Sequence, residues 1–261
     1  MGRVCGRQTA HTAVMKTTAI LTLIFAGALA QAAPRTWHFT CDYYNLDLKG
    51  HLINRQRFVG DYTRGLPNDM VRWNNVAIQN GSSFEDKFAP AQKQEFMEGL
   101  TYAHSAAAGG MLKPEFFKAF PPTAIQQRNL VWDTHMFEDF ASNFDKLKPN
   151  EVFHLHSGDA DLAGMGTFRD HDVQLILSGT TTRNGKKCAV IDYRALFNTL
   201  DTKMPGVDMV GRSDYWGQIW LALDTHEIEY ATLFEEVTGQ VTLGGQEKPL
   251  NIAVVRVGTF E

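Results

Sequence analysis

Metal-ligating side chains gather in one stretch of the chain. The strand-like segment VFHLHSG places His154 and His156 two positions apart, where strand geometry points both side chains to the same side. Two imidazoles on one side could chelate Zn²⁺ if a carboxylate joined them. The candidate carboxylates and one further histidine follow directly: Asp159, Asp161, Asp170, His171 and Asp172. No further ligand stands at a diagnostic spacing, so we favour a solvated strand face and predict no metal. A metal-dependent hydrolase centred on His154 and His156 is the alternative.

Other catalytic patterns are missing from the sequence. It contains no G-x-S-x-G elbow and no H-E-x-x-H pair, and no glycine-rich phosphate loop has a basic residue in reach. His135 and Glu138 stand one turn apart on a predicted helix, but the neighbouring phenylalanines favour a capped pair that faces solvent. We therefore predict neither a catalytic residue nor a cofactor, and we favour a non-enzymatic role over an enzyme.

The first part of the chain has the layout of a secretory signal. Lys16 precedes an apolar run at 19–30, and small residues then supply cleavage positions up to Ala33. The run has about a dozen residues, whereas a membrane-spanning helix needs roughly 20. We predict a signal region at 1–33, with Met15 as an alternative start after residues 1–14, and an exported, periplasmic or extracellular chain without a transmembrane segment.

The rest, residues 34–261, is expected to form a single β-rich domain. The whole chain has a net charge of −4, and residues 1–33 hold three basic residues and no acidic one. The remainder is therefore more acidic, which argues against a nucleic-acid partner. Its two cysteines, Cys41 and Cys188, lie in strand-like runs. They could form a disulfide in an oxidising compartment or remain two separately buried thiols.

Apolar periodicity predicts strands, then helices, then strands. A period of two dominates before residue 81 and after residue 151, whereas helical spacing appears near 90–106 and 124–147 with a short piece at 114–120. We therefore expect an α+β fold that is predominantly antiparallel β. Roughly eight to ten strands would form a curved, half-barrel-like sheet, with two or three helices inserted between two β meanders.

The functional hypothesis rests on the predicted hairpin at 215–243, which has apolar residues on both faces. Its Ile219/Leu221/Leu223 side alternates with a side that carries Trp216 and Trp220, so neither face reads as fully solvated. If one face packs on the predicted helix, the other needs a second sheet, a ligand or another chain. The predicted ligand cavity comprises the two tryptophans and the helix phenylalanines: Trp216, Trp220, Phe137, Phe140 and Phe144. An aromatic core that is simply full is the alternative.

Residues 173–260 resemble the C-terminal meander of periplasmic half-barrel carriers, the superfamily of the lipoprotein-localisation carrier. The resemblance rests on the hairpin at Asn184-Gly185, the stretch WLALDTHEIEYATL, the stretch TGQVTL and a closing amphipathic strand. It implies a curved sheet partly closed by helices, with a cavity for a lipid or acyl chain. We therefore expect a soluble carrier of an apolar small molecule. A structural or protein-interaction envelope domain is the alternative, and the oligomeric state stays open.

Overall fold

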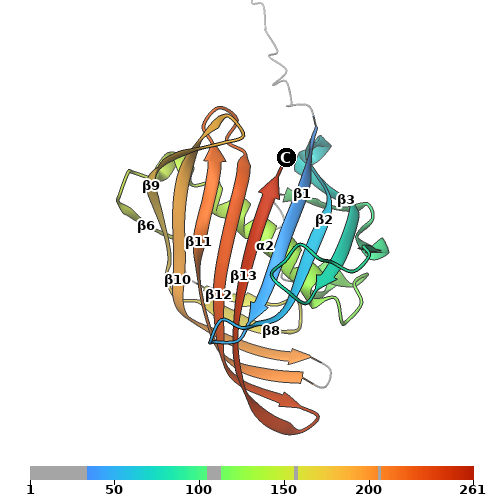
Figure 1. Cartoon of the computed structure of the whole chain (residues 1–261). Helices are drawn as coiled ribbons and strands as arrows, with labels where there is room; N and C mark the ends of the chain where they lie inside the picture. The colour runs from blue at the N-terminus through green and yellow to red at the C-terminus, as the bar shows by residue number, and fades with distance from the viewer. Residues whose placement is uncertain (1–33, 105–112, 156–157, 205–206) are drawn as a thin grey trace, which may run out of the picture. The chain divides into compact units, whose positions relative to one another are not determined.

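One antiparallel sheet dominates the computed structural model (Figure 1), which describes residues 34–104, 113–155, 158–204 and 207–261. The sheet has 13 strands, and its main path runs β4-β3-β2-β1-β13-β12-β11-β10-β8-β7, with β5 paired to β3 and β9 lying between β10 and β6. The sheet is open and curved. The predicted signal region 1–33 lies outside the described residues. Among those residues, no helix is long and apolar enough to cross a membrane.

The strands fall into an N-terminal and a C-terminal group on either side of the helical section. The first group is β1 (Arg35–Leu46), β2 (Leu52–Leu66), β3 (Met70–Gly81), β4 (Gln92–Lys93) and β5 (Leu100–Ala103). The second is β6 (Val152–Leu155), β7 (Gly158–Asp161), β8 (Gly166–Asp170), β9 (Val173–Arg183), β10 (Lys186–Met204), β11 (Val207–Ala222), β12 (Ile228–Leu243) and β13 (Gln246–Phe260). β1 pairs with β13, so the two groups share one sheet.

The predicted hairpins are present. Asn184 and Gly185 both have positive φ, 49° and 78°, the backbone that a tight two-residue turn requires between β9 and β10. β11 and β12 pair from Val207↔Leu243 to Leu221↔Ile228. The antiparallel prediction is thus confirmed, although the sheet has 13 strands rather than eight to ten.

The prediction of two or three helices is wrong. Within the described ranges the structure has one α-helix, α2 (Ile125–Ala141), besides short 3₁₀ turns at Pro67–Asp69, Glu95–Met97, Pro114–Phe117 and Phe144–Lys146. Residues 92–103 instead form β4, a 3₁₀ turn and β5 against β3. Gly99 has a φ of 70°, and its N–H donates to the carbonyl of Trp73 at 3.0 Å. This left-handed residue ends any helix, while pairing with β3 satisfies the backbone.

The helix α2 packs on one face of the sheet, here called the inner face. Phe137 and Phe140 lie in a buried cluster with Tyr193, Ile219 and Leu221 from β10 and β11. The Phe140 and Tyr193 rings are 5.1 Å apart. α2 is shorter than predicted and ends at Ala141, so Phe144 belongs to the following 3₁₀ turn.

Buried ion pairs also join α2 to the sheet. Arg256 of β13 is 5% exposed, and its Nε lies 3.0 Å from an Oδ of Asp133 on α2. The Arg256 Nη1 donates to Glu235 of β12 at 2.7 Å, and the Tyr43 hydroxyl donates to Asp133 at 2.8 Å. Burial raises the pKa of Asp133 to about 6, against the opposing effects of Arg256 and Tyr43. The network fixes the position of the helix, because each buried charge needs its partners.

The two cysteines form no disulfide. Cys41 on β1 and Cys188 on β10 are both free and buried. Strands β13, β12 and β11 lie between them. Four inter-strand steps of about 4.8 Å separate strands β1 and β10 by roughly 19 Å across the sheet. A disulfide needs Cα atoms within about 7 Å. Of the two alternatives for the cysteines, the structure has the separately buried thiols.

Candidate functional site

A row of aromatic and apolar side chains crosses the outer face of the sheet, opposite α2. Strand register places Trp216 beside Phe234, Phe234 beside Val255, and Val255 beside Tyr44. Directly paired residues share a face, and Trp216 has opposite parity to the buried Ile219 of the same strand. The row therefore runs from β11 through β12 and β13 to β1 on the side away from the helix.

Two aromatic pairs form the centre of this surface. Trp216 stacks on Phe234 with ring centroids 6.1 Å apart and planes 11° apart. The second pair is Trp220 and Tyr230, each four residues along its strand from a member of the first pair. Their ring centroids are 4.8 Å apart. The Arg183 guanidinium lies 4.8 Å from the Tyr230 ring centroid. Trp216 is 38% exposed, an unusual exposure for a side chain of its size.

These pairs border a hollow of about 670 Å³ that is open to solvent, here called the outer-face groove. Small-ligand sites typically have volumes of about 300–1,000 Å³. The lining residues come from β10, β11 and β12: Asp192, Tyr193, Arg194, Leu196, Trp216, Gly217, Gln218, Trp220, Tyr230, Thr232 and Phe234.

The polar groups of the groove bind mainly one another. The Gln218 side-chain amide donates to Asp192 at 2.8 Å and accepts from the Trp220 indole N–H at 3.2 Å. Arg194 donates through Nε to Gln174 at 2.8 Å. The indole N–H of Trp220 is thus already satisfied, which leaves the aromatic faces as the surface offered to a ligand.

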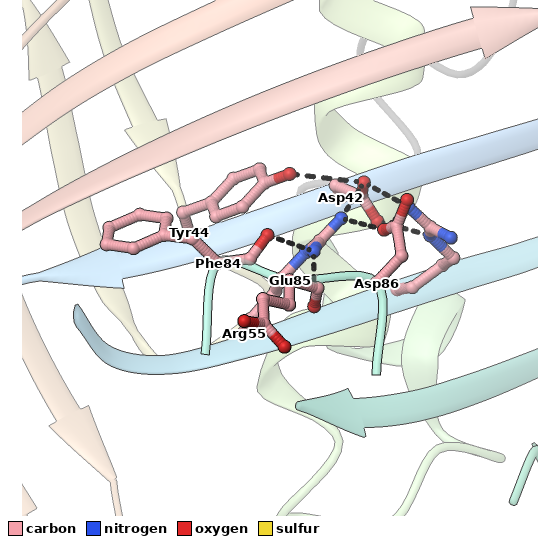
Figure 2. Close-up of polar contacts among 7 residues, drawn as sticks. Asp42, Tyr44, Arg55, Phe84, Glu85 and Asp86 are labelled. Carbon is pink, nitrogen blue, oxygen red and sulfur yellow. Dashed lines mark hydrogen bonds and ion pairs between the residues drawn. The ribbon is translucent and has the colours of Figure 1, made fainter. Parts of the chain in front are cut away.

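Another part of the outer face, around Asp42, Tyr44, Arg55 and Arg57, is partly covered by the chain itself. Residues 82–91, here called the loop cover, lie over β1 and β2 and are held by Arg55, whose side chain is 3% exposed (Figure 2). Arg55 donates to the carbonyls of Phe84 and Glu85 at 3.1 and 3.2 Å and to Asp42 at 2.8 Å. Its guanidinium lies 4.6 Å from the Tyr44 ring and 4.5 Å from the Phe88 ring.

Asp42 is the acceptor at the centre of this cluster. It accepts two hydrogen bonds from Arg57, both 2.7 Å long, besides the one from Arg55. Burial acts to raise the pKa of Asp42, but the hydrogen bonds from Arg57 and Arg55 outweigh it and hold the pKa below its usual range. The carboxylate therefore stays ionised and keeps both arginines in place.

The five predicted cavity residues do not line one hollow. Trp216 and Trp220 lie together in the outer-face groove, whereas Phe137, Phe140 and Phe144 lie on the inner side with α2. The sequence shows the alternation that separates the tryptophans from Ile219 and Leu221. It does not reveal the register that brings Tyr230 and Phe234 beside the tryptophans, so these partners were missed.

The predicted histidine pair is only partly described. His154 of β6 is exposed, and its Nδ1 lies 2.7 Å from Asp172, while His156 lies outside the described residues. Neighbouring carboxylates have other partners: Asp159 pairs with Arg169, Asp161 accepts the Gly164 N–H, and Asp170 accepts the Tyr215 hydroxyl. Within the described ranges, no three metal-ligating groups converge around His154.

Comparisons with known proteins do not show which family the chain belongs to. No family model matches it, and no curated protein matches it. Among solved structures, a DUF1329 family protein from Desulfovibrio piger ATCC 29098 shares 9% sequence identity, with 88% of this chain and 85% of that chain covered and a TM-score of 0.16. A likeness at this TM-score carries no argument about function.

Proposed function

We propose that this protein is an exported, non-enzymatic binding protein that holds an acyl chain or a similar elongated apolar ligand in the outer-face groove. The observation that carries the proposal is the uncovered aromatic surface. The chain covers the Tyr44 side of this face with its own loop but leaves Trp216 38% exposed in an open hollow of about 670 Å³. Exposed apolar patches of this kind typically mark interaction sites.

The dimensions of the aromatic surface favour an elongated ligand. Trp216 and Trp220 are four residues apart on β11, which separates the two aromatic pairs by about 13 Å along the strand. One extended chain can therefore contact both pairs. Each 100 Å² of apolar surface that it removes from water contributes about 2.5 kcal/mol before the costs of association.

Two arginines near the groove favour an acidic head group, while the groove's own carboxylate, Asp192, is occupied by Gln218. Arg194 lines the groove from β10, and Arg183 lies against Tyr230. A guanidinium is the side chain best suited to a carboxylate or phosphate because it can donate two parallel hydrogen bonds. A fatty acid combines such a head with an extended apolar tail.

Titration of the full chain with a fluorescent fatty acid tests the proposal. Trp216→Ala and Trp220→Ala should each weaken binding about tenfold, equivalent to about 1.4 kcal/mol, because each removes half of an aromatic pair. Phe197→Ala is the matched control, since Phe197 is 63% exposed on the neighbouring β10 but does not line the groove. Absence of binding, or equal binding by all variants, would refute the proposal.

Export has a separate test, because it rests on the N-terminal composition alone. Mass spectrometry of the protein secreted by a bacterial host should find a new N-terminus near Ala33. An exported protein that retains Lys16 would contradict the predicted cleavage.

A further inference from the structure

Three metal-ligating side chains meet on the inner side of the sheet, away from the groove. His135 and Glu138 lie three residues apart on α2, which places them on one helix face. His104 follows directly after β5. One ligand atom from each of the three lies within 4.8 Å of the other two. Among the described residues, no other three His, Cys, Asp or Glu side chains come this close together.

Glu138 is held firmly in this cluster. It is 6% exposed, so the expectation of a solvent-facing His135/Glu138 pair is wrong. One carboxylate oxygen accepts from the Tyr62 hydroxyl at 3.0 Å and lies 2.9 Å from His104 Nε2. The other lies 3.3 Å from Arg64 Nη1. Outer contacts of this kind orient ligating carboxylates in metal sites.

His135 offers a second, independent indication of a ligand. Its Nδ1 is buried and has no hydrogen-bond partner in the structure. The His135 and His104 rings have centroids 5.7 Å apart, with planes at 70°. Buried polar atoms are nearly always paired, so a buried ring nitrogen without a partner, on an imidazole that lies beside a second imidazole, calls for an explanation.

A small hollow adjoins the cluster. It has about 20 Å³ of space, close to what one water molecule requires. The lining includes Glu138 with its neighbours Tyr62, Arg64 and Thr134. A water molecule here would stand beside the Glu138 carboxylate, although neither His104 nor His135 lines the hollow.

We propose that His104, His135 and Glu138 bind one Zn²⁺ ion, with a water molecule as the fourth ligand. Two imidazoles and one carboxylate are a known ligand set for zinc with an open position. Metal–ligand bonds of about 2.0–2.2 Å keep two ligand atoms within roughly 4.4 Å of each other. Small side-chain rotations therefore suffice, and the ion takes the place of the His104–Glu138 hydrogen bond.

The test uses Zn²⁺ alone and the full chain, purified without a polyhistidine tag and stripped with a chelator. Equilibrium dialysis with elemental analysis should find one equivalent of zinc, and the melting temperature should rise with added Zn²⁺. His135→Ala and His104→Ala should each lose that equivalent and the shift in melting temperature. His154→Ala is the matched control, since His154 is exposed and pairs with Asp172, and it should retain both.

Folding of the variants is checked by far-UV circular dichroism, and His135→Asn serves as a milder replacement if His135→Ala does not fold. Cobalt substitution gives a second readout, because tetrahedral Co²⁺ with nitrogen ligands absorbs visible light. No zinc uptake by the unsubstituted chain, or uptake that persists in both histidine variants, would overturn the proposal. Fatty-acid binding in the groove should be unchanged by zinc, so the two proposals can fail separately.

Discussion

The outer face carries similar aromatic pairs on β1 and on β11–β12, but their surroundings differ. On β1 and β2, Tyr44 stacks on Phe84 at 6.1 Å with Arg55 against the ring. On β11 and β12, Trp216 stacks on Phe234 at the same centroid distance. The first aromatic pair includes a residue of the loop cover, whereas both members of the second belong to the sheet. The chain supplies a second ring from a loop in one half, where Phe84 is itself 59% exposed, and leaves an open hollow in the other.

This difference separates stability from binding. A surface covered by the chain's own loop contributes to the free energy of unfolding, because its contacts disappear when the chain unfolds. A surface left open contributes little until a ligand covers it. Substitutions in the two halves should therefore affect different measurements.

The largest expected effect is that of Arg55→Ala. The change leaves the buried Asp42 without one of its two arginines and frees the carbonyls of Phe84 and Glu85. Loss of one partner of a buried ion pair costs about 3–5 kcal/mol, and because Asp42 keeps Arg57 we expect a loss near the lower bound, about 3 kcal/mol, in urea unfolding. The control is Arg169→Ala, whose pair with Asp159 is 54% exposed on both sides, and it should unfold at nearly the same urea concentration as the unsubstituted protein. Equal costs for the two variants would contradict the anchoring role of Arg55.

A smaller loss is expected for Phe88→Ala. The Phe88 ring lies 4.5 Å from the Arg55 guanidinium and 4.4 Å from that of Arg57. Each such contact contributes about 0.5–1 kcal/mol, or more where water is excluded, so a total of about 1–2 kcal/mol should be lost. Limited proteolysis should then cut within residues 82–91. A loop that stays resistant would indicate that Arg55 alone holds it.

The loop cover should also weaken in acid. The pKa of Asp42 is lowered in the folded protein, so its contribution to stability is present above the unfolded pKa of about 3.9 and is lost as pH falls through the folded value. Amide protection of residues 82–91, measured against the intrinsic exchange rate at each pH, should therefore fall below about pH 4. In Asp42→Asn this acid-dependent step should be absent, and an unchanged step would assign it to another carboxylate.

The smallest effect on stability is expected in the groove. Trp216→Ala should change the free energy of unfolding by less than about 1 kcal/mol, because the side chain is partly exposed and lies outside the buried clusters. The same variant is expected to lose ligand affinity, which reverses the pattern of Arg55→Ala. A strongly destabilised Trp216→Ala protein would indicate that the groove is part of the core.

Local patterns predict the hairpins and most of α2, because a turn at Asn184-Gly185 and a phenylalanine stripe are encoded within a few residues. They fail for residues 92–103, where apolar spacing suits a helix but β4 and β5 gain hydrogen bonds from distant β3. The same pairing of β5 with β3 places His104 beside α2. Helical spacing in the sequence predicts that His135 and Glu138 are neighbours, but it does not predict that His104 joins them.

The sheet path that ends in β4 and β7 also bears on association between molecules. β4 has 2 residues and β7 has 4, as do β5 and β6, whereas β10 has 19. A long unpaired strand is a template for a strand of another molecule, and short edge strands remove most of that template. If β4 and β5 detached, the 12 residues of β3 would become an edge available for pairing. The two short strands therefore shield the part of β3 that they pair with, Met70–Trp73 and Ala77–Ile78, from pairing with another molecule.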